Sequence, residues 1–274
     1  MLRPASSLFA AAALAAALSA AAADANHASA GHASTSHASA GATSMAATLA
    51  AARTDAATPL LTRLQRLAPG ADPKVIALAL EAAECAAASG SVTPAKRLAV
   101  IDYSRPSTEP RLWVFDLQHA RLLYAEHVAH GRSSGENFAN AFSNIESSHQ
   151  SSLGLFATAE TYRGGNGYSL RMEGLEPGVN DLARARAIVM HGAPYVDPAQ
   201  ALRQGRLGRS LGCPALRPAV ANEVIDTLKE GQLLFAYYPD RQWLANSKFF
   251  RCGAKRTASV QAGSAQAGAT TAQR

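Results

Sequence analysis

Two side chains capable of nucleophilic attack, Ser210 and Cys213, lie three positions apart in "GRSLGCPAL" at residues 208–216. The pattern G-x-S-x-G around Ser210 is typical of a nucleophile elbow, which needs a buried strand before the serine and an acid and then a histidine after it. The preceding stretch "DPAQALRQGRLG" is polar and broken by glycine, and no histidine occurs from residue 193 to the end of the sequence. The sequence therefore does not support Ser210 as a nucleophile.

Cys213 meets more of the requirements for covalent catalysis. A catalytic thiol needs a base, donors for the oxyanion and a backbone that can come close to the substrate. Gly212 allows that approach, and the amides of Gly212 and Cys213 are candidate oxyanion donors. His191 in "IVMHGA" ends an apolar stretch and is the best-placed base among the eight histidines. The alternative is that Cys213 is a small buried hydrophobic residue without a catalytic role.

Several motifs resemble a known family. They are "VAHGRSSG" (128–135), "FSN" (142–144), "SSLGLF" (151–156), "TAETYRGGNGYSLRMEGLEPGVND" (158–181), "IVMHGAPYV" (188–196) and "GRSLGCPAL". In this order they are similar to the divergent murein L,D-transpeptidase catalytic domain family, a YkuD-like group that remodels bacterial peptidoglycan. The resemblance covers about residues 97–250.

The sequence departs from the main YkuD pattern at three positions near the cysteine. Leu211 stands where better-known members carry a second histidine, and Pro214 and Ala215 replace an apolar residue and an arginine. The family's arginine role in binding substrate therefore cannot be assigned by position. Arg209 and Arg217 are the candidates to replace it.

The resemblance implies a cysteine acyltransferase acting on the stem peptides of peptidoglycan. His191 would deprotonate Cys213, the thiolate would form a thioester, and an amine of a second stem would resolve it. The motif assigns Gly212 and Ser210 to the same catalytic set, with a backbone carbonyl near the motif, such as that of Gly192, fixing the tautomer of His191. Hydrolysis of the same bond by an L,D-carboxypeptidase and a non-catalytic peptidoglycan-binding module remain alternatives.

Other residues are candidates for lining the substrate cleft. Gly192 follows the proposed base, Tyr162 and Tyr168 flank a glycine-rich segment, and Asn144 ends one of the family motifs. An ordinary β-turn is the competing interpretation of the glycine-rich segment. His127 and His130 would point to opposite faces of a strand, so we expect no metal site and no cofactor.

The charge of the chain favours an anionic partner other than nucleic acid. The formal net charge is +6 and the sequence pI is about 9.5, but aromatic residues make up only 6% of the chain. The basic residues are scattered, with no run of five, which argues against a nucleic-acid groove. An anionic cell-wall polymer fits better.

Both ends of the sequence differ from its middle. Residues 1–25 have the charge and apolar pattern of a signal peptide, which predicts export to the periplasm or cell envelope and no stable membrane span after cleavage. Residues 26–55 repeat a His-Ala-Ser unit and are expected to form a low-complexity linker, and 253–274 a disordered tail. In an oxidising compartment, a Cys85–Cys252 bridge would leave Cys213 free; two unpaired buried cysteines are the alternative.

The elements between these ends must position the candidate site. We expect a helical segment over 56–92, with a helix running from a cap at Asp72 to Gly90, and a catalytic domain over 93–252. The domain is expected to be mainly β, a YkuD-like β-sandwich or mixed sheet with a few flanking helices. Its strands are predicted at 97–104, 111–118, 121–130, 153–163, 168–174, 187–192 and 232–239, with a tight hairpin joining the second and third, and its helices at 178–186 and 217–231.

Overall fold

The structure is a computed structural model, and it describes residues 59–250 and 252. The predicted signal peptide, linker and C-terminal tail lie outside these residues. None of the helices in the described part is long and apolar enough to cross a membrane.

The described strands form one mixed sheet with the order β3-β2-β1-β8-β4-β5-β6-β7. All seven predicted strands are confirmed, and the two-residue strand β7 is the one that the sequence analysis missed. Strand β1 pairs antiparallel with β2 and parallel with β8. The strand bounds are β1 Arg97–Asp102, β2 Leu112–Asp116, β3 Arg121–Glu126, β4 Gly154–Gly164, β5 Gly167–Gly174, β6 Val189–Gly192, β7 Ala215–Leu216 and β8 Leu233–Tyr237.

Two predicted helices are present close to their expected bounds, α3 at Pro73–Ala88 and α5 at Pro218–Leu228. Each has proline at its first position, where the missing amide hydrogen costs nothing. The Asp72 side chain caps α3 by accepting a hydrogen bond from the Lys74 amide at 2.8 Å. The remaining helices are α2 Leu60–Leu67, α4 Pro198–Gln204 and α6 Arg241–Asn246.

The predicted helix at 178–186 is wrong, because this segment is a series of turns. Gly178 has a φ of 76°, and the side chain of Asn180 bonds to the carbonyls of Leu153 and Leu155. Its oxygen accepts from the Glu176 amide at 2.8 Å. An asparagine that bonds to nearby backbone competes with helix formation, so the segment is fastened to β4 instead.

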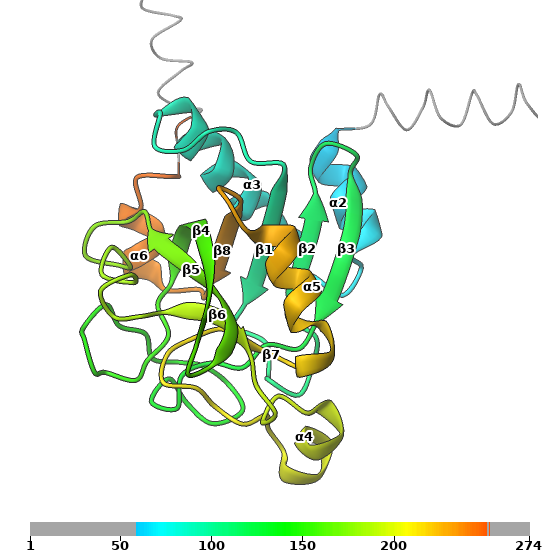
Figure 1. Cartoon of the computed structure of the whole chain (residues 1–274). Coiled ribbons are helices and arrows are strands. Elements are labelled where there is room, and N and C mark those ends of the chain that lie inside the picture. Colours follow the sequence, from blue (N-terminus) through cyan, green and yellow to red (C-terminus); the bar gives the residue numbers. More distant parts are fainter. Residues whose placement is uncertain (1–58, 251, 253–274) are drawn as a thin grey trace, which may run out of the picture. The chain divides into compact units, whose positions relative to one another are not determined.

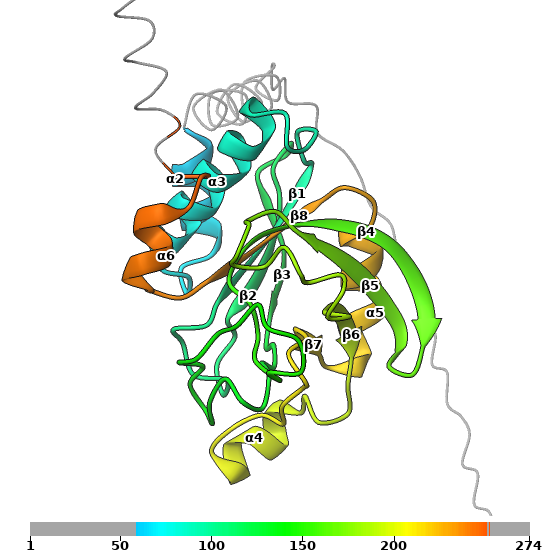
Figure 2. The same cartoon turned by 90° about the vertical axis from the view of Figure 1, so that its left-hand side faces the viewer.

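Helices cover the sheet on two sides. Figure 2 shows α2, α3 and α6 on one side and α5 on the other, while α4 projects from one end. In the view of Figure 1, α5 lies in front of the strands. Residues of α2, α3 and α5 share one hydrophobic core cluster with the sheet. The helical segment before the sheet is therefore packed into the same core.

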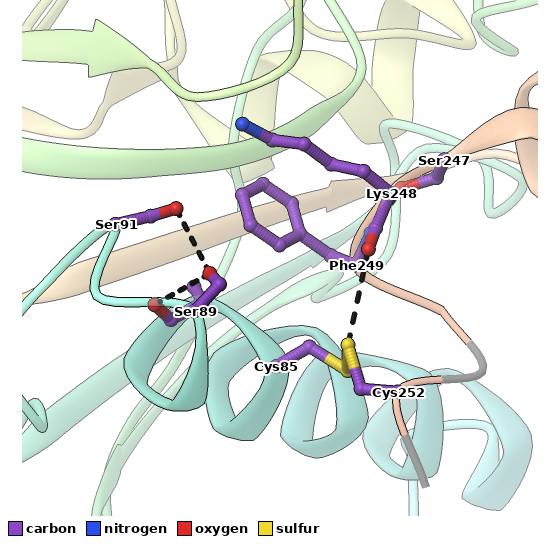
Figure 3. The surroundings of a disulfide bond; sticks show 8 residues. Cys85, Ser89, Ser91, Ser247, Lys248, Phe249 and Cys252 are labelled. Atoms are coloured by element: carbon purple, nitrogen blue, oxygen red, sulfur yellow. Dashed lines mark hydrogen bonds between the residues drawn. A yellow bond between two sulfur atoms is a disulfide. The ribbon is translucent and has the colours of Figure 1, made fainter. Parts of the chain in front are cut away.

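A disulfide joins Cys85 of α3 to Cys252, which follows α6 (Figure 3). Cys213 is the free cysteine in the part of the chain that the structure describes. The bridge proposed from the sequence is thus present, and the alternative of two unpaired cysteines is not.

Candidate active site

The pairing of β6 with β7 places the segments that carry His191 and Cys213 next to each other. These strands run parallel, with His191 opposite Ala215 and Gly192 opposite Leu216. The His191 amide also faces the Pro214 carbonyl at 3.4 Å. Cys213 lies two residues before Ala215, just outside β7. Residues 22 apart in sequence therefore sit on neighbouring segments.

The Cys213 sulfur lies against the beginning of β6. It accepts from the Val189 amide at 3.5 Å and donates to the Ala187 carbonyl at 3.7 Å. Only 7% of Cys213 is exposed. This burial raises the pKa of the thiol, while the Val189 amide and the nearby positive charge of Arg186 act in the opposite direction. The thiol is therefore protonated at neutral pH.

The His191 ring is fixed by its own strand. Its Nδ1 lies 3.0 Å from the Gly192 carbonyl oxygen. Because a carbonyl only accepts, Nδ1 carries the hydrogen in this contact and the lone pair is on Nε2. Burial lowers the pKa of His191, opposed by the bond to Gly192. The ring is therefore a neutral base, and Nε2 is the atom that can take a proton.

The thiol and the imidazole are not hydrogen-bonded to each other, since the contacts of each are with backbone groups. Catalytic hydrogen bonds are often long in ligand-free structures and shorten when the substrate binds. Because both groups are neutral, they are not a preformed ion pair.

Ser210 holds the shape of the loop before the cysteine. Its hydroxyl accepts from the Gly212 amide at 3.1 Å and donates to the Cys213 carbonyl at 2.7 Å. The Gly212 amide, expected from the sequence to face an oxyanion, is therefore already bonded to Ser210. Gly212 has a φ of 128°, and a Cβ there would lie 2.8 Å from Ile188 Cδ1. Only glycine fits this position.

Gly192 lies where β6 meets α5. A Cβ on Gly192 would be 2.9 Å from the Ala221 Cβ. The absence of a side chain thus lets the helix approach the strand. Gly192 contributes to the candidate site through its carbonyl, which orients the His191 ring.

The two tyrosines predicted to line the cleft lie on opposite faces of the sheet. Register pairs Tyr162 with Ser169 and Ser169 with His191, which puts these three side chains on one face. Tyr168 is on the other face, and its hydroxyl donates to Asp226 of α5 at 2.8 Å. Tyr162 therefore lies on the same face of the sheet as His191, whereas Tyr168 does not.

Asn144 joins two loops. Its side chain donates to Asp181 at 2.8 Å and accepts from the Leu182 amide at 3.1 Å. It also lines a pocket of about 420 Å³ between these loops and α6, and neither His191 nor Cys213 lines that pocket. The structure does not bring Asn144 together with the candidate catalytic pair.

The two candidate substrate-binding arginines are both paired with acids. Arg209 bonds to Glu136 at 2.6 Å and to the Gly135 carbonyl at 2.9 Å. Arg217 makes a two-pronged ion pair with Glu126 at 2.7 and 2.8 Å. Any carboxylate that bound to either guanidinium would compete with these partners.

Sequence analysis missed Arg186, whose charge acts on Cys213. Its guanidinium donates to the Gln150 carbonyl at 2.8 Å and to the Ser148 hydroxyl at 3.1 Å. It therefore holds the loop that precedes β4, and Gln150 of this loop approaches Gly212. Arg186 lies in the segment mistaken for a helix, where a surface position was the natural expectation.

Among the described residues, no group of three or more histidine, cysteine, aspartate or glutamate side chains is arranged to hold a metal ion.

Comparison with known proteins gives a family for this architecture. Residues 67–237 match the YkuD_2 family, described as an L,D-transpeptidase catalytic domain. No curated protein sequence matches the chain.

Solved structures with similar folds share little sequence with the chain. An L,D-transpeptidase from Mycobacterium smegmatis is 14% identical, with a TM-score of 0.33 over 53% of this chain and 59% of its own. An L,D-transpeptidase (Yku) from Stackebrandtia nassauensis is 13% identical, with a TM-score of 0.33 over 60% and 68%. The helical cell shape determining protein Pgp2 from Campylobacter jejuni is 10% identical, with a TM-score of 0.36 over 59% and 57%. The chain thus spans less than two thirds of the mycobacterial and Campylobacter proteins it matches.

Proposed function

Because this chain belongs to the L,D-transpeptidase catalytic domain family, we propose that it transfers acyl groups between peptidoglycan stem peptides through a thioester on Cys213. The observation that carries the proposal is a free thiol on the segment next to the strand that carries a neutral histidine. Cys213 follows Gly212 at the edge of β6, and the His191 Nδ1 is bound to the Gly192 carbonyl, which leaves Nε2 as the base.

The reaction proceeds in two half-steps. The Cys213 proton moves to His191 Nε2 as the sulfur attacks a stem-peptide carbonyl carbon, and negative charge forms on the carbonyl oxygen. The imidazolium then gives its proton to the departing amine, and the thioester remains. An amine of a second stem then attacks the thioester carbonyl and gives a proton to His191 Nε2. The C–S bond breaks as the new amide forms, and the imidazolium returns the proton to the sulfur.

The Cys213 amide is the donor best placed for the oxyanion. The Gly212 amide is occupied by Ser210, whereas the Cys213 amide has no hydrogen bond to another residue within the described part of the chain. A preorganised backbone donor of this kind is typically worth about 3 kcal/mol in the transition state.

Export to the cell envelope is part of the proposal. The disulfide between Cys85 and Cys252 supports it, because structural disulfides form in oxidising compartments. The signal-like pattern of residues 1–25 and the net positive charge are consistent with work on an anionic wall polymer.

The test is acylation of the purified protein by a disaccharide-tetrapeptide fragment of peptidoglycan. Intact-mass spectrometry should show the fragment minus its terminal residue on the wild-type protein and on a Cys85→Ser/Cys252→Ser variant, but not on Cys213→Ala. An adduct on Cys213→Ala would refute the assignment of the nucleophile.

The fate of the thioester separates the remaining alternatives. Muropeptides from sacculi treated with the enzyme should gain cross-linked dimers if an amine resolves the thioester. Accumulation of shortened stems alone would identify a carboxypeptidase. Binding to sacculi without any adduct would identify a non-catalytic module, the alternative that the burial of Cys213 favours.

A further inference from the structure

The hydroxyl of Ser151 lies between two glycine peptide groups. It accepts from the Gly131 amide at 3.0 Å and donates to the Gly212 carbonyl at 3.0 Å. Ser151 is 1% exposed. A buried hydroxyl that both donates and accepts fixes the orientation of both groups, because neither can turn to water instead.

The Gly212 carbonyl and the Cys213 amide belong to the same peptide bond. In a planar trans peptide the carbonyl and the N–H point in opposite directions. Holding the Gly212 oxygen toward Ser151 therefore directs the Cys213 N–H away from Ser151. The carbonyl side of this peptide is bonded, and no other described residue accepts a hydrogen bond from its amide side.

Ser151 is itself held at both of its backbone groups. Its amide donates to the Ser134 hydroxyl at 2.9 Å, and its carbonyl accepts from the Ser143 amide at 3.0 Å. The hydroxyl is thus presented to the cysteine loop by a fixed backbone, which is what preorganisation requires.

The segment around Gly131 is packed tightly against the cysteine loop. The Ser210 amide donates to the His130 carbonyl at 2.9 Å, and the Arg132 amide to the Ser210 carbonyl at 2.8 Å. A Cβ on Gly131 would lie 2.9 Å from the Gly212 Cα. Behind this segment, the fully buried Arg111 donates to the Val128 carbonyl at 2.8 and 3.0 Å.

We propose that Ser151 is a positioning residue for acyl transfer, because its hydroxyl holds the Gly212 carbonyl and so directs the Cys213 amide at the oxyanion. The inference rests on the proposed function. It adds a residue 62 positions before the cysteine that touches neither the thiol nor the imidazole but determines where the oxyanion donor points.

The test compares Ser151→Ala with Thr158→Ala. Thr158 in β4 is 3% exposed, and its hydroxyl also donates to a backbone carbonyl and accepts from a backbone amide, both of Gln232. Both variants lose a buried hydroxyl that donates to a backbone carbonyl and accepts from a backbone amide; Ser151 also has a side-chain hydrogen bond with Tyr103. Only Ser151 bonds to the cysteine loop.

Two rates are measured on each variant: acylation by the stem fragment and alkylation of Cys213 by iodoacetamide. Acylation passes through an oxyanion, whereas alkylation displaces iodide and forms none. Loss of one well-placed oxyanion donor typically costs about 10²–10³ in rate, so a misdirected donor should cost about tenfold or more. We expect Ser151→Ala to lower the maximal acylation rate by this factor. The fragment concentration at half-saturation and the rate of alkylation should not change.

The Thr158→Ala variant should keep the wild-type values of the maximal acylation rate, the half-saturating fragment concentration and the alkylation rate. Acylation by Ser151→Ala at the wild-type rate would overturn the inference and leave the proposed function intact. Equal slowing of alkylation and acylation would also overturn it, because a general loosening of the site would then account for the effect. Failure of the wild-type protein to acylate would instead refute the proposed function.

A measurement on the wild-type protein needs no variant. A stem-peptide aldehyde adds the Cys213 S–H across its C=O and places an oxygen where the oxyanion would form. In amide NMR spectra, the Cys213 proton should move downfield on addition and the Gly212 proton, already bonded to Ser210, should move little. A downfield shift at Gly212 with none at Cys213 would overturn the inference.

Discussion

At the scale of single residues, burial keeps both reacting groups neutral. It raises the pKa of Cys213 and lowers that of His191, so at neutral pH the pair is a thiol and an imidazole. A protonated thiol reacts more slowly than a thiolate, because the thiolate is the nucleophile. In the proposed reaction, attack therefore requires the simultaneous transfer of the thiol proton to His191.

We predict a specific pH dependence for the isolated thiol. Alkylation of Cys213 by iodoacetamide should follow a thiol pKa above the ordinary value, because burial disfavours the thiolate. At pH 7 the rate should accordingly be below that of free cysteine, measured by mass spectrometry with the disulfide intact. A midpoint below that of free cysteine would contradict the prediction and indicate a preformed thiolate–imidazolium pair.

Acylation should depend on pH in a different way. It needs neutral His191, whose pKa lies below its ordinary value, so the acid limb of the acylation profile should fall below pH 6.5. His191→Gln, which removes the base, should lower the acylation rate and abolish that limb.

At the scale of elements, the site depends on turns as much as on strands. Glu176 accepts from the Leu155 amide and from the Trp243 indole, and Asn180 bonds to the carbonyls of Leu153 and Leu155. These bonds attach the turns at 175–187 to the beginning of β4 and to α6. The same turns supply Ala187 and Arg186 to the surroundings of Cys213.

Removal of this attachment should destabilise the protein. Asn180→Ala leaves the Leu153 carbonyl and the Glu176 amide without their partners, and we expect a loss of about 2–4 kcal/mol in the free energy of unfolding. Asn246→Ala, which removes one bond on the exposed surface of α6, should change it by less than about 0.5 kcal/mol. Urea unfolding measures both, and equal losses would contradict the importance assigned to Asn180.

At the scale of the whole molecule, the disulfide joins distant parts of the chain. Cys85 and Cys252 are 167 residues apart, and α3 packs on the sheet through the shared core. The closed loop therefore contains the entire sheet. Cross-linking across so long a loop removes many conformations from the unfolded state.

Reduction of the bridge should lower stability by about 2–5 kcal/mol. Thermal unfolding with and without a phosphine reductant measures the effect, and the Cys85→Ser/Cys252→Ser variant should match the reduced wild type and not respond to the reductant. Identical melting temperatures for the oxidised and reduced protein would show that packing alone holds α3 in place.

The local signals in the sequence predicted most elements. Short apolar runs, several of them alternating, located the seven main strands, and the Asp72-Pro73 pair marked the beginning of α3. The same signal, Asp197-Pro198, precedes α4, where it was overlooked within a polar stretch. The prediction of a helix at 178–186 was wrong because Asn180 bonds to the carbonyls of Leu155 and Leu153, which lie 25 and 27 positions away in the sequence.

From the sequence alone, Cys213 and His191 could be singled out, because a cysteine after glycine and a histidine at the end of a strand are local patterns. Which groups orient them was decided only by the tertiary structure. Ser210 takes the Gly212 amide, Ser151 takes the Gly212 carbonyl, and Tyr168 turns toward α5. Hydrogen bonds between segments far apart in the chain depend on strand register and loop packing, and no local pattern records them.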